Sequence, residues 1–330
     1  MLAFFLSHMK EFQLIEKFFK PLTKAHEAAQ NLADDVAKIS LKKNEELVVS
    51  KDMIVEDVHF LRSDGGFKIA SKLLRANLSD LAATGATPLH YLLGFSKNKN
   101  TDAKFFAEFA QGLKSVQDEF DLCLIGGDTV SSEKLFFSVT IFGVIKKGKI
   151  LSRANAKNGD LVYVSGTIGD AGLGLNISAL RLTPYALRLK HFFPTPRISL
   201  GKKLLEKNLS NCAIDVSDGL LADLRHICQS SKLAAEIYFD RIPISSAAKN
   251  FLKKNPQKNP LDLLSSGDDY ELIFTTNPKN EKKISALAKN LKLDLTCIGK
   301  LTKTVGKSFT VTLRDTKNQK ITIKKFGYEH

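Results

Sequence analysis

Cysteine is scarce in this 330-residue chain, and its four cysteines are far apart in the sequence. They form no Cys-x-x-Cys pair, which excludes a zinc-finger spacing and gives no sign of a redox motif. Most of them lie inside apolar runs, as buried reduced thiols do, so we expect a cytoplasmic protein. These residues are Cys123, Cys212, Cys228 and Cys297.

Long apolar runs are also missing, because no segment approaches the ~20 residues that a membrane-spanning helix needs. Residues 2–6 are apolar but follow no charged region, so they do not resemble a signal peptide, and Met9 is an alternative start to Met1. The hydrophobic fraction of 43% and the charged fraction of 25% are ordinary for a globular protein. We expect no membrane partner.

Acidic residues are the minority charge, since 49 Lys and Arg against 35 Asp and Glu give a net charge of +14. This balance suits nucleic acid, an anionic surface or a nucleotide. The lysines are dispersed, however, and segments such as 253–259 and 317–320 are typical of solvated loops. A nucleic-acid groove would interleave basic and aromatic residues on one face, so we expect no nucleic-acid partner and keep that class as an alternative.

The length favours two domains, which we expect at residues 1–150 and 151–330. Helical and strand patterns alternate in both halves, which predicts an α/β (α+β) fold with a mixed N-terminal sheet. Helices are expected at 12–19, ending before Pro21, and at 68–83, 101–120, after 194–197, 245–254 and 282–291. Strands are expected at 47–55, interrupted by Asp52, and at 89–95, 121–125, 135–145, 160–164, 234–239, 271–274, 293–298, 309–313 and 320–323.

The stretch 211–224 is the main candidate for a functional site. There an apolar run ends in Asp215, Ser217 and Asp218, and a helical pattern follows at once. One interpretation is a capped junction, with Ser217 as the helix N-cap. The other is a site for a hard cation, because acids also gather at 34–35, 52, 77–80, at an expected turn at 126–129, and at 267–269. Mg²⁺ prefers such oxygen ligands and is commonly bound together with substrate phosphates. That chemistry suits ATP-dependent phosphoryl transfer without a covalent enzyme intermediate.

A glycine-rich turn follows the strand at 160–164 and spans Gly166 to Gly174. Such a turn at a helix start is able to cradle a phosphate, but the spacing fits neither the dinucleotide fingerprint nor the Walker pattern. Tight packing of the turn is the alternative.

Seven motifs in order make the chain resemble the thiamine-monophosphate kinase family along nearly its whole length. They are the acids 34–35, SKDMIVEDVHF at 50–60, NLSDLAATGATP at 77–88, GGDT at 126–129, SGTIGD at 165–170, IDVSDGL at 214–220 and SGDDYEL at 266–272. The family belongs to the aminoimidazole-ribonucleotide-synthetase-like superfamily of ATP-using enzymes. Two further possibilities are members of that superfamily, of the selenophosphate or purine-precursor synthetase type. A selenium enzyme would need an N-terminal reactive cysteine, and none precedes Cys123.

The resemblance implies that ATP and thiamine monophosphate give thiamine diphosphate and ADP, with several Mg²⁺ ions. It also implies a homodimer paired through the N-terminal domains, with ATP and Mg²⁺ bound in the N-terminal domain along the domain cleft, which the C-terminal domain completes. The implied magnesium positions are Asp35, Ser50, Lys51, Asp52, Asp80, Asp128, Asp215 and Asp218, with Asp215 and Asp128 closest to the chemistry. The implied nucleotide contacts are Gly127, Asp128, Arg153 and Ser217, and the implied substrate contacts are His59 and Asp268.

Without the resemblance, His59 is a polar residue at a strand end and Arg153 a surface charge. The sequence also departs from the family pattern at several positions. Residues 31–33 replace a Gly-Ile-Gly turn, and Lys51 replaces a threonine, where a backbone carbonyl would have to serve as ligand. Asp268 replaces a glutamate, and Lys325 stands where an aromatic residue commonly flanks the substrate.

Overall fold

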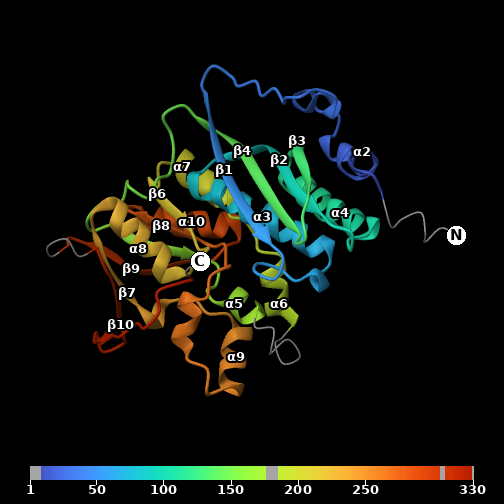
Figure 1. The fold of residues 1–330 in the computed structure, drawn as a ribbon. Coiled ribbons are helices and arrows are strands. Elements are labelled where there is room, and N and C mark those ends of the chain that lie inside the picture. Colours follow the sequence, from blue (N-terminus) through green and yellow to red (C-terminus); the bar gives the residue numbers. More distant parts are fainter. Residues whose placement is uncertain (1–8, 176–184, 305–308, 329–330) are drawn as a thin grey trace. The chain divides into compact units, whose positions relative to one another are not determined.

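The computed structural model describes residues 9–175, 185–304 and 309–328, so residues 2–6 and Met1 lie outside it. The chain forms two compact units (Figure 1). One comprises Met1–Leu81 and Thr87–Gly148, and the other Ala82–Ala86 and Lys149–His330. Both combine helices with a sheet, so the predicted α/β (α+β) class is confirmed.

The first unit is built on a four-stranded sheet of order β1-β4-β2-β3. Strands β2 and β3 are parallel, and the other two pairs are antiparallel, so the predicted mixed N-terminal sheet is confirmed. The strands are β1 (Glu45–Val55), β2 (Thr87–Lys97), β3 (Cys123–Ser131) and β4 (Phe136–Lys146).

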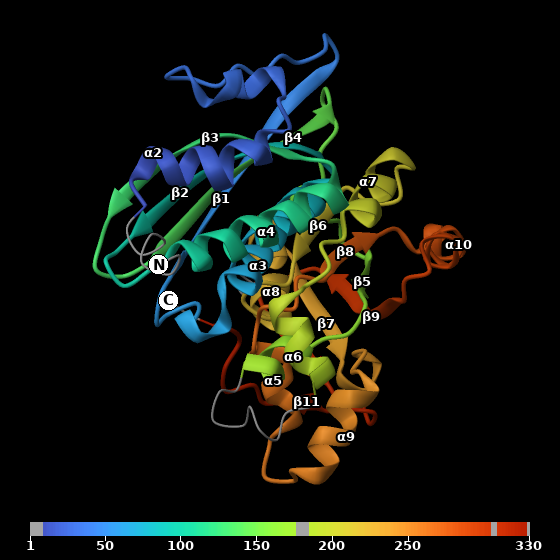
Figure 2. The same cartoon turned by 90° about the vertical axis from the view of Figure 1, so that its right-hand side faces the viewer.

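Two long helices, α3 (Gly66–Thr84) and α4 (Ala103–Phe120), lie on one face of this sheet (Figure 2), and the N-terminal helix α2 (Glu11–Leu14) lies beside its β3 edge (Figure 1). The helix-covered face is closed by aromatic packing. The rings of Phe109 on α4 and Phe137 on β4 stack with centroids 4.1 Å apart. Burial of such large rings contributes to the stability of this unit beyond the buried area alone.

Two expectations about these strands were wrong. Asp52 does not interrupt β1, which continues through it and pairs it with Val139, because alternation lets a single polar side chain occupy one face. The segment 126–129 is not a turn but part of β3. A Cβ atom on Gly127 would lie 1.9 Å from the carbonyl oxygen of Leu93, so only glycine permits this close pairing with β2.

The N-terminal segment also differs from the expected single helix at 12–19. After α2 the chain forms a π-helical turn η1 (Ile15–Phe19), and 3-10 turns η2 (Lys20–Thr23) and η3 (Glu27–Leu32) follow. Pro21 is the second residue of η2 and does not end the helical path, because the first turn of a helix does not need its missing N–H.

The second unit has a seven-stranded sheet of order β11-β10-β7-β9-β5-β8-β6, in which β10 and β7 are paired in parallel and the other described pairs are antiparallel. Its strands are β5 (Leu161–Ser165), β6 (Cys212–Asp215), β7 (Ala234–Tyr238), β8 (Leu272–Thr276), β9 (Leu295–Thr302), β10 (Val311–Arg314) and β11 (Lys320–Ile321). Its α-helices are α5 (Asp170–Leu175), α6 (Tyr185–Phe192), α7 (Ile198–Glu206), α8 (Leu220–Ser231), α9 (Ser246–Lys254) and α10 (Glu281–Leu291). Short 3-10 turns complete the chain at η4 (Arg62–Asp64), η6 (Phe239–Arg241), η7 (Pro260–Ser265) and η8 (Pro278–Asn280).

Helix α8 packs its apolar face onto this sheet, where Leu224, Ile227 and Cys228 join the core formed with β5–β10. All four cysteines are free thiols, three of them buried and Cys297 half-buried, as predicted. None of the helices in the three described stretches is long and apolar enough to cross a membrane.

Candidate functional site

The turn between β6 and α8 carries the acids that the sequence singles out. Asp215 ends β6 and is only 3% exposed. Ser217 is not the helix N-cap, contrary to the capping interpretation, because the N-cap is Gly219 with φ +124° and no side-chain cap. The capping acceptor is Asp223 instead, whose Oδ2 accepts the N–H groups of Ser217, Asp218 and Gly219 at 3.1 Å each. One buried carboxylate therefore fixes the backbone of the whole turn.

The turn is electrostatically suited to a cation. Burial and the neighbouring Asp218 raise the pKa of Asp223 to about 7, although the three N–H donors act in the opposite direction. Asp218, Asp223 and His226 offer ligand atoms that lie within 4.8 Å of one another. A divalent ion would relieve the repulsion between the two carboxylates.

A second loop packs directly against this turn. The N–H of Asp268 donates to the carbonyl of Ser217, and the N–H of Tyr270 donates to that of Val216, both at 2.8 Å. The carboxylate of Asp268 accepts from the Tyr270 hydroxyl at 3.2 Å and lies 3.4 Å from Nδ1 of His191. The predicted substrate residue Asp268 is thus brought beside the turn of Asp215, Ser217 and Asp218.

The glycine-rich turn uses its N–H groups within the protein. Gly169 and Ala171 donate to the carboxylate of Asp269 at 2.7 and 3.2 Å. Burial raises the pKa of Asp269 well above its usual value. Because a carboxylate of the chain itself fills the place that a phosphate would take, the tight-packing interpretation is the better one here.

Arg153 is not brought to the same place. Its side chain is exposed. Its carbonyl oxygen accepts from the Ser231 hydroxyl at 2.7 Å and lies 3.7 Å from the sulfur of Cys212, the first residue of β6. Asp215 and Ser217 follow the other end of that strand, so within this unit the backbone of Arg153 is separated from them by the length of β6.

In the first unit, the predicted ligands fall on two opposite faces of the sheet. Ser50 and Asp52 point toward α3, where the Ser50 hydroxyl donates to Asp80. Asn77, also on α3, accepts the backbone N–H of Asp52 at 3.2 Å. Burial and the charge of Asp80 raise the pKa of Asp52 to about 7. This face therefore holds two close carboxylates and a hydroxyl oxygen, a donor set that suits Mg²⁺.

The other face of the sheet bears a cavity of about 840 Å³ whose lining includes Asp35, Lys51, Gly127 and Asp128. Nζ of Lys51 donates to the Ser138 hydroxyl at 2.5 Å. A protonated ammonium has no lone pair, so the Lys51 side chain is not a metal ligand and instead brings positive charge to the cavity.

His59 closes the turn after β1. The ring Nδ1 of His59 accepts the backbone N–H of Val55 at 3.2 Å, and the backbone N–H of His59 donates to the Val55 carbonyl at 2.9 Å. These bonds give the ring a local structural role, and its contact with substrate stays a prediction. Sequence reasoning did not single out Asp223, since a single acid inside a helical pattern carries no signal of its backbone partners. Asn77 and Asp269 lie in motifs that it did single out, but it assigned neither side chain a role.

Comparisons with known proteins show which family this chain belongs to. Residues 33–145 match the family model "AIR synthase related protein, N-terminal domain", and residues 157–312 match its C-terminal counterpart. The thiamine-monophosphate kinase of Buchnera aphidicola subsp. Schizaphis graminum is 38% identical over 97% of this chain and 98% of its own length. The Haemophilus influenzae enzyme of that name is 36% identical over 98% of both. This chain belongs to the thiamine-monophosphate kinase family.

Solved structures agree with that membership. A thiamine-monophosphate kinase from Stenotrophomonas maltophilia has a TM-score of 0.81 and 35% identity, covering 92% of this chain and 96% of its own. AaThiL, solved in complex with AMPPCP and TMP, has a TM-score of 0.76 and 28% identity and covers 98% and 99%. Hydrogenase maturation protein HypE in complex with ATP, at 20% identity and a TM-score of 0.78, shares the fold.

Proposed function

We propose that this chain transfers the γ-phosphoryl group of ATP to thiamine monophosphate, giving thiamine diphosphate and ADP. A phosphate oxygen of thiamine monophosphate forms the new bond to phosphorus as the bond to the bridging oxygen of ADP breaks. The observation that carries the proposal is similarity over nearly the full length of both chains to thiamine-monophosphate kinases, together with AaThiL bound to AMPPCP and TMP.

Mg²⁺ fits the residues present. Asp52 with Asp80, and Asp218 with Asp223, are carboxylate pairs in which burial and like charge raise one pKa to about 7, so a cation would stabilise both ionised forms. The ions would be held by Ser50, Asp52 and Asp80 in the first unit and by Asp215 and Asp218 in the second, with Asp35 and Asp128 as further ligands. When bound, Mg²⁺ would neutralise the charge of the transferring phosphoryl group.

The remaining side chains of the proposed site bind and orient the substrates. Ser217 and Asp218 are fixed at their backbone by Asp223, so the Ser217 side chain would contact ATP, and the Asp218 carboxylate would hold Mg²⁺, without reorganisation of the turn. Gly127 and Asp128 face the cavity that also holds Lys51, whose charge attracts phosphates. Arg153 is proposed to contact the nucleotide, and His59 and Asp268 the thiamine phosphate. We further propose a cytoplasmic homodimer paired through residues 1–150, in which ATP and Mg²⁺ are bound by residues of 1–150 together with the residues of 151–330 named above.

An assay of the purified chain with ATP and Mg²⁺ tests the proposal. Thiamine monophosphate, thiamine and an aminoimidazole ribonucleotide precursor are offered in parallel, and nucleotide and product are separated by chromatography. We expect ADP and thiamine diphosphate in equal amounts from thiamine monophosphate alone. Turnover with another acceptor and none with thiamine monophosphate would assign the chain to a different reaction of the superfamily.

A further inference from the structure

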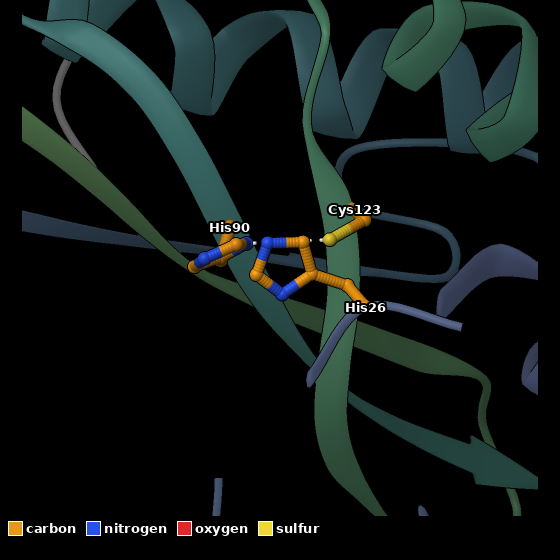
Figure 3. Close-up of side chains that lie close together, drawn as sticks. All are labelled: His26, His90 and Cys123. Carbon is orange, nitrogen blue, oxygen red and sulfur yellow. Dashed lines mark hydrogen bonds between the residues drawn. The ribbon is translucent and has the colours of Figure 1, made fainter. Parts of the chain in front are cut away.

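Three side chains that the phosphoryl transfer does not use meet in the first unit. His26 precedes η3, His90 lies on β2 and Cys123 begins β3 (Figure 3). Their ligand atoms lie within 4.8 Å of one another. Nδ1 of His90 and Sγ of Cys123 are 3.3 Å apart, and the rings of His26 and His90 meet edge to face with centroids 4.6 Å apart.

We propose that His26, His90 and Cys123 bind one Zn²⁺ ion at a site separate from the magnesium ligands. Two imidazole nitrogens and one sulfur are a donor set for Zn²⁺, and they are poor ligands for Mg²⁺. In tetrahedral zinc sites nitrogen and sulfur ligands stand roughly 3.5 Å apart, close to the separation of the His90 and Cys123 atoms. A water molecule would complete the four ligands.

The burial of the three residues suits ion entry from one side. His90 and Cys123 are 7% and 4% exposed, whereas His26 is exposed and caps the site. Nδ1 of His26 accepts the N–H of Ala28 at 3.1 Å, so Nε2 is the nitrogen left to face an ion. Because a neutral imidazole carries one proton, binding through Nε2 moves that proton to Nδ1 and breaks the Ala28 bond.

The charge states of the buried pair permit binding with release of one proton. Burial and the neighbouring His26 lower the pKa of His90 to about 4, so its ring is neutral and able to ligate at pH 7. Burial raises the pKa of the Cys123 thiol; Asp121 raises it further and Lys24 lowers it. The ion therefore displaces a thiol proton, and affinity rises with pH.

Binding at this site would fix the path of the N-terminal segment. Ala28 and Ala29, next to His26, already pack against Cys123 and Ile125 of β3. The same segment continues to Asp34 and Asp35, which line the cavity with Gly127 and Asp128. An ion joining η3 to β2 and β3 would thus hold those acids in place.

The test uses the full chain, freed of metal with a chelator and then saturated with Mg²⁺ to fill the acidic sites. Titration calorimetry with Zn²⁺ should give one ion per chain with release of one proton. Co²⁺ should bind at the same place and give a near-ultraviolet thiolate-to-cobalt charge-transfer band. Loss of an outer partner of a zinc ligand commonly weakens binding 10–100-fold, so Cys123→Ser and His26→Asn should each weaken it by about 100-fold or more.

Cys297→Ser is the matched control, because Cys297 is a half-buried free thiol on β9 of the second unit and belongs to no cluster of metal-binding side chains in the described residues, so it should leave both signals unchanged. His26→Asn keeps the test valid if the buried Cys123→Ser protein folds poorly, since His26 is exposed. No stoichiometric Zn²⁺ binding in wild type, or binding unaffected by His26→Asn, would overturn the proposal.

Discussion

Asp215 is a buried carboxylate at the end of β6, and its charge is what a magnesium site there requires. Asp215→Asn is nearly isosteric and should keep the fold while removing that charge. Because charge neutralisation grows in the transition state, we expect turnover to fall by on the order of 10², or about 3 kcal/mol, with a smaller change in KM. Steady-state kinetics at saturating Mg²⁺, with the melting temperature, check this.

Ser217→Ala is the control for the same turn, because Ser217 does not cap α8 and its backbone is fixed by Asp223. We expect its melting temperature to stay near that of the wild type, so any loss of turnover reports on ATP contact alone. Near-normal turnover of Asp215→Asn would make the carboxylate structural and contradict the assignment.

Asp223 is predicted to act as a positioning residue. Replacement by leucine, of similar size, leaves the N–H groups of Ser217, Asp218 and Gly219 without their acceptor. Unsatisfied buried donors cost about 1–3 kcal/mol each, partly relieved here by water, so we expect a total loss of about 2–4 kcal/mol in urea unfolding.

Asp223→Asn distinguishes positioning from metal binding. The amide oxygen still accepts the N–H groups but carries no charge. We expect it to restore stability and most of the turnover that Asp223→Leu loses. If Asp223→Asn were fully stable yet as inactive as Asp215→Asn, Asp223 would itself be a metal ligand.

At the scale of elements, the sequence predicts most helices and strands because their apolar periodicity is strong, as in β1, α4 and α10. It misplaces elements whose cause is a distant partner. Gly126 and Gly127 read as a turn, and only the approach of Leu93 shows why a strand needs glycine there. Likewise the acids of the candidate site are visible as motifs, but Asp52 and Lys51 are assigned to opposite faces only by the strand itself.

The junction after β5 depends on Gly166, and this gives a prediction at the same scale. A Cβ atom there would lie 2.0 Å from Oε1 of Glu271. Glu271 cannot move away easily, because Arg197 donates to it at 2.6 Å and the Ser165 hydroxyl at 2.5 Å. Gly166→Ala should therefore disrupt this network as well as strain the backbone at φ +57°. We expect a loss of about 3 kcal/mol or more in urea unfolding.

Gly159→Ala is the matched control, since its φ of +85° is also unfavourable for alanine but nothing lies within 4 Å of the new Cβ atom. Backbone strain alone should cost it about 1 kcal/mol. Equal losses in the two variants would mean that the Glu271 network gives way without cost.

At the scale of the whole molecule, the chain is basic, with a net charge of +14, yet it keeps some of its acids in close pairs. Asp52 with Asp80 and Asp218 with Asp223 are pairs in which like charges are kept together. Keeping like charges together costs folding free energy, and the proposed binding of Mg²⁺ would offset that cost.

The predicted homodimer through the N-terminal domain is tested on the outward face of β1. Leu47, Val49 and Met53 alternate on that face and are 38%, 54% and 49% exposed. In a two-fold interface every substitution enters twice, so Val49→Lys places two charges against apolar surface. Each charge should cost about 1.4 kcal/mol or more, so the dissociation constant of the dimer should rise by on the order of 10²-fold. Sedimentation equilibrium at micromolar concentration should then show a dimer for wild type and a monomer for Val49→Lys.

Val58→Lys is the control for this substitution. Val58 is a valine 61% exposed in the turn after β1, so its replacement should leave the dimer intact. A wild-type monomer would contradict the predicted homodimer, and a dimer indifferent to Val49→Lys would place the pairing elsewhere, because a second charge beside Lys51 on this face adds a desolvation cost to an apolar contact.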